Sequence, residues 1–224
     1  MADVTGVLRQ TRLLREAPAD DLTELASTAR QRVFRRGQVV FSRDDPGEGL
    51  VVVISGRVKV MMRSADGGEL TLTVVGPGGT LGELSIADGG PRSADAETLE
   101  QSELLFIPAD AVRRVCQRRP EVARALTDSI AGSLRRLSDA ASDLVFLDLP
   151  RRVAKVLLAQ PRDGDGTIRP GLSQEEIARQ SAGTRQSVNS AMRGFERRGW
   201  IDVQDRTVII SQPTALARFA GYPS

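Results

Sequence analysis

Short apolar runs separated by glycine-containing turns dominate the first half of the chain. The longest uninterrupted aliphatic run is LVVVI, residues 50–54, and the pair Asp66-Gly67 is a strong hairpin signal between two such runs. Many short strands at close spacing indicate an antiparallel jelly roll or barrel. The N-terminal stretch and residues 109–119 are predicted to be helices outside it. The predicted strands are residues 32–34, 39–41, 50–63 with one break at Ser55-Gly56, 70–75, 94–99 and 104–107.

After Pro120 the pattern changes to that of a long helix, because proline is tolerated in a first helical turn and the next proline is Pro150. Apolar positions recur at alternating steps of 4 and 3 residues, and the one polar member of this seam is Thr127. Such a stripe packs either on its own domain or on a second copy of the helix. Its length and its small residues favour a parallel dimer, with predicted contacts at Ala123, Thr127, Ile130, Leu134, Leu137, Ala141 and Leu144.

Residues 172–201 predict two further helices joined by a tight turn. Ser173 followed by Glu176 is a capping box that opens the first helix, and Ala182-Gly183 ends it. Thr184 is predicted to cap the second helix. Two such helices can present the second one to the major groove of DNA, although an ordinary helical hairpin with a solvated basic face gives the same pattern. A hairpin follows at residues 200–203 and 206–210; it is typical of a wing and favours DNA binding.

The second helix of this pair carries side chains suited to base recognition at its N-terminal end. Arg185 can donate two hydrogen bonds to guanine O6 and N7, and Gln186 can pair with adenine. Val188, Met192 and Phe195 fall on the opposite face and are predicted to pack. The predicted DNA contacts are Thr184, Arg185, Gln186, Ser187, Asn189, Ser190 and Arg193, and Arg193, Arg197 and Arg198 are suited to phosphate.

Charge is distributed unevenly along the 224 residues. Residues 151–224 carry 12 Lys and Arg against 7 Asp and Glu, whereas residues 1–150 carry 19 against 22. An acidic N-terminal part and a basic C-terminal part are typical of a sensor domain joined to a nucleic-acid-binding domain, although chance surface charge gives the same asymmetry.

The chain offers little catalytic chemistry. It contains no histidine, which excludes imidazole-based zinc sites, histidine-ligated haem and Ser-His-Asp hydrolysis. Its one cysteine, Cys116, cannot form an intramolecular disulfide. No nucleophile, base and orienting group can be assembled, so we expect neither an enzyme nor a metal site. The apolar runs are far shorter than the roughly 20 residues of a membrane helix, and no secretion signal opens the chain, so we expect a cytoplasmic protein.

The segment GELSIADGGPRSADAE, residues 82–97, holds the most distinctive candidate chemistry. A guanidinium such as that of Arg92 is the side chain best suited to a buried phosphodiester anion, and Ser93 with backbone N–H groups can complete the site. Gly82 would let the backbone come close to a neighbouring group, because glycine has no side chain. The alternative is a mutual salt bridge between Arg92 and Glu83, which would only fix the loop. Leu84 and Ile86 indicate that one end of the segment packs.

Three motifs in a fixed order resemble one known family over essentially the whole chain. They are GELS…PRSA at 82–94, DLVFLDLPRRVAK at 143–155 and LSQEEIA…TRQSV at 172–188. The chain is similar to the cyclic-AMP receptor protein and fumarate–nitrate regulator (CRP/FNR) family of bacterial transcription factors. The resemblance implies that Glu83 accepts a ribose 2′-hydroxyl and that Arg92 and Ser93 hold a cyclic phosphate. It places the ligand among Gly82, Glu83, Leu84, Ser85, Arg92, Ser93, Ala94, Leu137 and Ser138.

The chain departs from the family at two places. Nucleotide-responsive members offer the adenine a threonine followed by serine or asparagine, where this chain has Leu137 and Ser138. Leucine cannot hydrogen-bond to the base, so the ligand is cyclic AMP held more loosely, cyclic GMP, another small molecule, or none. In the recognition helix, Gln186 and Ser190 replace a glutamate and a basic residue, so the operator should differ from the usual TGTGA half-site.

These features predict an α+β protein with four parts. They are a jelly-roll cyclic-nucleotide-binding domain (1–119), a dimerisation helix (120–146), a hinge (147–150) and a winged helix-turn-helix domain (151–224). We expect a homodimeric regulator of palindromic DNA, controlled by a cyclic nucleotide, with RNA polymerase as a candidate partner. The alternatives are a repressor that needs no ligand and a nucleotide-sensing module that acts on a protein partner.

Overall fold

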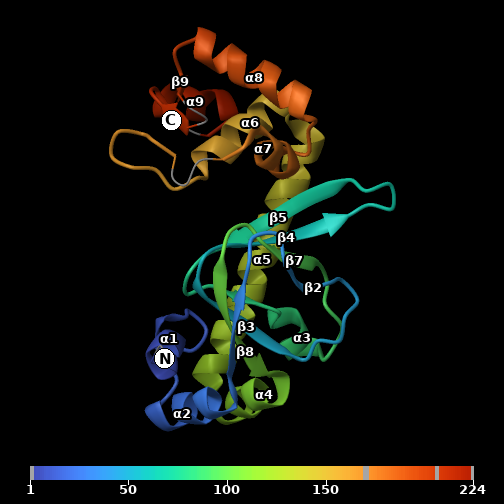
Figure 1. Cartoon of the computed structure of the whole chain (residues 1–224), viewed down its shortest axis with the longest axis vertical. Helices are drawn as coiled ribbons and strands as arrows, with labels where there is room; N and C mark the ends of the chain where they lie inside the picture. The colour runs from blue at the N-terminus through green and yellow to red at the C-terminus, as the bar shows by residue number, and fades with distance from the viewer. Residues whose placement is uncertain (1–2, 169–171, 205–206, 223–224) are drawn as a thin grey trace. The chain divides into compact units, whose positions relative to one another are not determined.

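A computed structural model describes residues 3–168, 172–204 and 207–222. The chain forms two compact units, residues up to Leu137 and residues from Ser138 onward, and Figure 1 shows the elements of each. The division falls inside helix α5 (Pro120–Phe146), upstream of the predicted hinge. The α+β class is confirmed: a β domain comes first, a long helix follows, and a helix-turn-helix with a small sheet comes last.

The first unit holds two four-stranded antiparallel sheets, with strand orders β1-β8-β3-β6 and β2-β7-β4-β5. Each strand predicted from the glycine-separated runs is present, and Gly67 lies in the β4–β5 turn with a positive φ of 86°. The elements are α1 (Val4–Gln10), α2 (Ala19–Thr28), β1 (Arg30–Phe34), β2 (Val39–Phe41), β3 (Gly49–Ser55), β4 (Val58–Arg63), β5 (Glu69–Val75), β6 (Thr80–Leu81), α3 (Glu83–Asp88), β7 (Asp95–Thr98), β8 (Ser102–Pro108), α4 (Ala109–Arg118) and the first part of α5.

Strand β3 explains why the run LVVVI is continuously apolar. Successive side chains of a strand point to opposite faces. Val51 and Val53 join a core with residues of both sheets. Leu50 and Val52 join a second core with the helices α1, α2, α4 and the start of α5. Because β3 is covered on both faces, a polar side chain at any of positions 50–53 would need a buried partner.

Helix α5 packs on its own unit through Val122 and Leu126, which are buried and do not belong to the predicted seam. Within the seam, Ile130 is partly buried against the same core, whereas Leu134 and Leu137 are 63% and 51% exposed. Leu144 is also exposed, and Thr127 and Ala141 are exposed as well. Packing within one chain therefore leaves most of the seam uncovered.

The second unit packs helices around a small two-stranded sheet. Its core includes Phe195, which contacts the rings of Trp200 and Phe219 at centroid distances of 6.0 and 5.7 Å. Arg206, which the sequence placed in the wing, lies outside the described residues. The elements are the end of α5, α6 (Leu149–Leu158), α7 (Gln174–Ser181), α8 (Arg185–Arg197), β9 (Ile201–Gln204), β10 (Thr207–Ile210) and α9 (Pro213–Ala220).

Helix α6 begins inside the segment predicted as a hinge. The Asp148 carboxylate accepts a hydrogen bond from the backbone N–H of Arg151 at 3.0 Å and so caps the helix. Pro150 is accommodated in the first turn, where its missing N–H would have no helical partner. Leu149 and Pro150 are therefore helical, and a hinge at 147–150 stays a prediction.

Candidate functional site

Strand β6 is followed by a sharp turn into the short helix α3, and Gly82 makes that turn. Its φ is 91°, a left-handed conformation that costs little only for glycine. A Cβ atom at this position would lie 2.0 Å from Nη1 of Arg92 and 3.0 Å from the carbonyl oxygen of Gly49. Gly82 is therefore required both by the backbone and by the space that the Arg92 guanidinium occupies.

Arg92 is buried, with 5% of its surface exposed, and its hydrogen bonding is incomplete. Nη2 donates to the carbonyl oxygen of Gly49 at 2.8 Å, and the guanidinium lies over the ring of Phe41 at 4.4 Å. Nε and Nη1 are buried and have no hydrogen-bond partner among the described residues. Buried polar groups without partners are uncommon in folded proteins, and those that occur need an explanation. Two buried cationic N–H donors beside a glycine are suited to an oxyanion.

Acidic side chains near Arg92 favour the positive charge of its guanidinium. Burial lowers the pKa of the guanidinium from its usual value, and the nearby carboxylates of Glu48, Asp45 and Glu83 oppose that shift. An arginine stays protonated in proteins even when buried. The site therefore presents a positive charge whose surroundings are acidic but make no ion pair with it among the described residues.

Glu83 does not pair with Arg92. Its Oε1 atom accepts hydrogen bonds from the hydroxyl of Thr80 in β6 and from the hydroxyl of Ser129 in α5, the latter at 3.3 Å. The mutual salt bridge considered from the sequence is absent from the described residues. Both charged groups are therefore held by other partners.

The other predicted ligand residues fall into two groups. Ser85 is buried and donates to the carbonyl oxygen of Pro91 at 3.2 Å, and Ala94 is buried. Ser93 is exposed. Ile86 packs as expected, but Leu84 is 44% exposed, because residues two positions apart in a helix such as α3 point to roughly opposite sides. Leu137 and Ser138 are exposed on α5, and their contact with a base stays a prediction.

Arg113 in α4 is a residue that sequence reasoning missed. Its guanidinium donates to the carbonyl oxygens of Ser85 at 2.7 Å and Ile86 at 3.0 Å, and it also pairs with Asp110. These bonds hold helix α3 against α4. Nothing in the sequence distinguishes this arginine from its basic neighbours on the same helix.

The helix pair of the second unit has the predicted caps. Ser173 and Glu176 form a capping box at the start of α7. Ala182 ends that helix with a φ of 50°, an unusual conformation for a residue other than glycine. Thr184 caps α8 by accepting a hydrogen bond from the N–H of Ser187 at 3.2 Å. Arg152 in α6 was not foreseen: its guanidinium donates to the carbonyl oxygens of Leu147, Ser181 and Ala182 and braces the turn.

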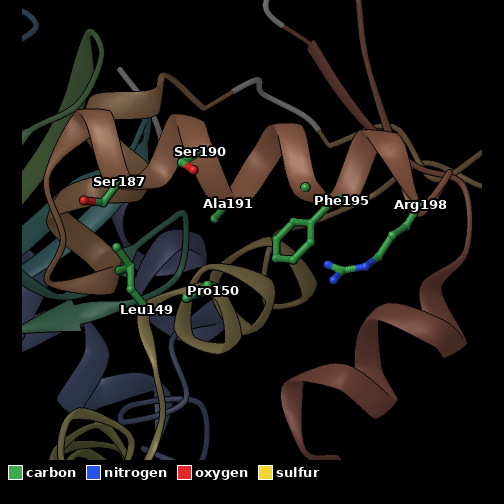
Figure 2. Close-up of a pocket in the computed structure, with 8 residues that line it drawn as sticks. Leu149, Pro150, Ser187, Ser190, Ala191, Phe195 and Arg198 are labelled. Carbon is green, nitrogen blue, oxygen red and sulfur yellow. The ribbon is translucent and has the colours of Figure 1, made fainter.

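Helix α8 has one buried face and one exposed polar face. Val188, Met192 and Phe195 are buried, as their spacing predicts. A groove lies between α8 and the start of α6, and Figure 2 shows Ser187 near Leu149 and Ala191 on the side of α8 that faces Pro150. All residues predicted to contact DNA are accessible to a ligand outside the unit. Asn189 is partly exposed, and the exposed ones are Thr184, Arg185, Gln186, Ser187, Ser190 and Arg193.

The described residues contain no arrangement of three or more His, Cys, Asp or Glu side chains that could hold a metal ion. Within the same residues, no helix is both long enough and apolar enough to cross a membrane. Cys116 is half-buried, and burial raises the pKa of its thiol.

Comparison with known proteins gives matches to both units. Residues 31–119 match the model of a cyclic nucleotide-binding domain, and residues 151–219 match that of a Crp-like helix-turn-helix domain. A CRP-like cAMP-activated global transcriptional regulator of Mycobacterium tuberculosis is 41% identical over 194 residues, 84% of this chain and 86% of that protein. The cyclic AMP receptor protein of Thermus thermophilus is 30% identical over 190 residues, 85% and 88% of the two chains.

A solved structure supports the fold. FixK2 from Bradyrhizobium japonicum superposes with a TM-score of 0.78 at 20% identity, covering 88% of this chain and 98% of that one.

Proposed function

Because this chain belongs to the CRP/FNR family, and is thus a DNA-binding transcription regulator and not an enzyme, we propose that it works as a homodimer controlled by a cyclic nucleotide. The nucleotide binds in the jelly roll of the first unit. The second unit reads an operator through α8. As a regulator of bacterial DNA, the protein acts in the cytoplasm, with RNA polymerase as a candidate partner.

The observation that carries this proposal is the incomplete hydrogen bonding of Arg92. Its Nε and Nη1 atoms are buried donors without partners in the part of the chain that the structure describes, and they lie next to Gly82, which has no side chain. A cyclic phosphate supplies oxyanions that these donors can bind, and charge-assisted hydrogen bonds are the stronger ones in proteins. Glu83, held by Thr80 and Ser129, is suited to accept a ribose hydroxyl.

Cyclic AMP is the first candidate for the ligand. Relatives at 41% and 30% identity are named as cAMP-activated or as a cyclic AMP receptor protein. The phosphate and ribose groups are shared with cyclic GMP, so the base must be distinguished elsewhere. We assign that role to Leu137 and Ser138, which offer one hydroxyl where the family offers two polar side chains.

The dimer forms through the exposed part of the α5 seam. Leu134, Leu137 and Leu144 are large apolar side chains that the single chain leaves 63%, 51% and 43% exposed. Two α8 helices of such a dimer enter successive major grooves, about 34 Å apart, and so require a palindromic operator. A ligand changes DNA affinity only if it favours one of two arrangements of the dimer.

A thermal-shift measurement tests the ligand. The purified chain is heated alone, with cyclic AMP and with cyclic GMP, since a ligand that binds only the folded state raises the melting temperature. We expect a concentration-dependent rise with cyclic AMP and a smaller rise with cyclic GMP. No rise with either nucleotide, combined with unchanged operator binding, would favour a repressor that needs no ligand.

A further inference from the structure

Glu83 is held from two sides by hydroxyl groups of different elements. Thr80 in β6 precedes it closely in the chain, whereas Ser129 in α5 is distant in sequence and approaches from the long helix. Both hydroxyls donate to Oε1. Among the described residues, no donor is hydrogen-bonded to Oε2, so that atom is available to a donor on a ligand.

We infer that Ser129 is a positioning residue that fixes the Glu83 carboxylate for recognition of a sugar hydroxyl. A glutamate side chain is flexible, and restricting it costs up to about 2 kcal/mol in lost rotamer freedom. Two donors on Oε1 restrict the side chain before the ligand arrives, so a hydroxyl that binds Oε2 loses less affinity to ordering. This inference rests on the proposed nucleotide binding.

The location of Ser129 gives the contact a second consequence. Ser129 is partly buried and lies on α5, between the core residue Leu126 and the exposed seam residue Leu134. The carboxylate that accepts the sugar hydroxyl is therefore bonded directly to the helix that carries the seam. In this arrangement Glu83 recognises the ribose 2′-hydroxyl. The contact between Ser129 and Glu83 that supports this recognition lies within one chain.

The test compares cyclic AMP with its 2′-deoxy analogue by isothermal titration calorimetry on the full-length protein. One hydrogen bond to a charged group corresponds to a difference in Kd of roughly tenfold or more. The wild-type chain should therefore prefer cyclic AMP by at least about tenfold. Ser129→Ala should reduce this preference to about threefold or less while leaving the affinity for the 2′-deoxy analogue nearly unchanged.

Two further variants separate positioning from a general effect on the helix. Ser133→Ala is a matched control one turn along α5, since the Ser133 hydroxyl donates to the backbone oxygen of Ser129 and is exposed. It should keep the wild-type preference. Ser129→Thr retains the hydroxyl and should restore most of the preference.

Each outcome bears on the inference. A Ser129→Ala protein that distinguishes the two nucleotides as well as the wild type would overturn it and leave the proposed function intact. A Ser133→Ala protein that loses the preference equally would overturn it too, because the effect would then belong to α5 in general. A wild-type chain that binds neither nucleotide would refute the proposed function and this inference with it.

Discussion

Replacing Arg92 by methionine should abolish nucleotide binding without unfolding the protein. Methionine has a similar length and can fill the buried space beside Phe41. In the nucleotide-free protein, each of the unpartnered Nε and Nη1 groups costs about 1–3 kcal/mol of folding free energy. The substitution removes that cost.

The same substitution also loses favourable contacts. The bond from Nη2 to the Gly49 oxygen contributes roughly 1.5–3 kcal/mol, as a hydrogen bond to a charged group, and the contact with the Phe41 ring contributes roughly 0.5–2 kcal/mol. The gains and losses nearly cancel. We expect the free energy of unfolding to change by less than about 2 kcal/mol.

Nucleotide affinity should respond very differently. Loss of two charge-assisted bonds to phosphate is expected to cost at least about 3 kcal/mol, which is more than a hundredfold in Kd. The assay is denaturant unfolding of the free protein, followed by calorimetric titration with cyclic AMP. Arg113→Met is the matched control: its guanidinium bonds are all made to protein groups, so its loss should lower the free energy of unfolding by about 1–3 kcal/mol.

An Arg92→Met protein that binds cyclic AMP with wild-type affinity would contradict the assignment of Arg92 to phosphate binding. A loss of more than about 3 kcal/mol of unfolding free energy in Arg92→Met, beyond the range expected for Arg113→Met, would mean that Arg92 is a structural residue.

Three further predictions concern the second unit and α5. Ala182→Gly removes the cost of a positive φ at alanine and should raise the free energy of unfolding by roughly 0.5–1 kcal/mol. Ala191→Gly inside α8 should lower the free energy of unfolding instead, and equal effects of the two substitutions in thermal unfolding would contradict this. Arg185→Ala should cost about 1–3 kcal/mol at one base pair in a binding assay with single-base operator variants, and a loss uniform over all variants would mean that Arg185 contacts phosphate only. The wild-type chain should sediment as the proposed dimer and Leu134→Glu as a folded monomer, and a dimer that Leu134→Glu leaves intact would exclude the α5 seam as the dimer interface.

The elements that could be predicted from the sequence are those with strong local signals. The continuous apolar run of β3, the Asp66-Gly67 turn and the Ser173–Glu176 capping box each depend on residues close together in the chain. The buried face of α8 follows from helical spacing alone. Resemblance to a family added the roles of Glu83 and Arg92, which spacing could not supply.

Other features depend on contacts between distant residues. Helix α3 is too short for a periodic pattern, so the sequence indicates only a loop there, and the prediction that Leu84 packs is wrong. Arg113 bonds to the carbonyl oxygen of Ser85, and Ser129 bonds to the carboxylate of Glu83. Only the fold brings these residues close together. The unpartnered donors of Arg92 became visible only when its burial and its neighbours were known together.

If the proposed function is right, nucleotide occupancy of the first unit controls DNA binding by the second. The most direct measurement selects operator sequences from random duplexes and then determines operator affinity of the wild-type and Arg92→Met proteins with and without saturating cyclic AMP. We expect cyclic AMP to tighten operator binding by the wild type about 5- to 150-fold, as is usual for allosteric coupling, and to leave operator binding by Arg92→Met unchanged. Equal operator affinity of the wild type with and without cyclic AMP would contradict it.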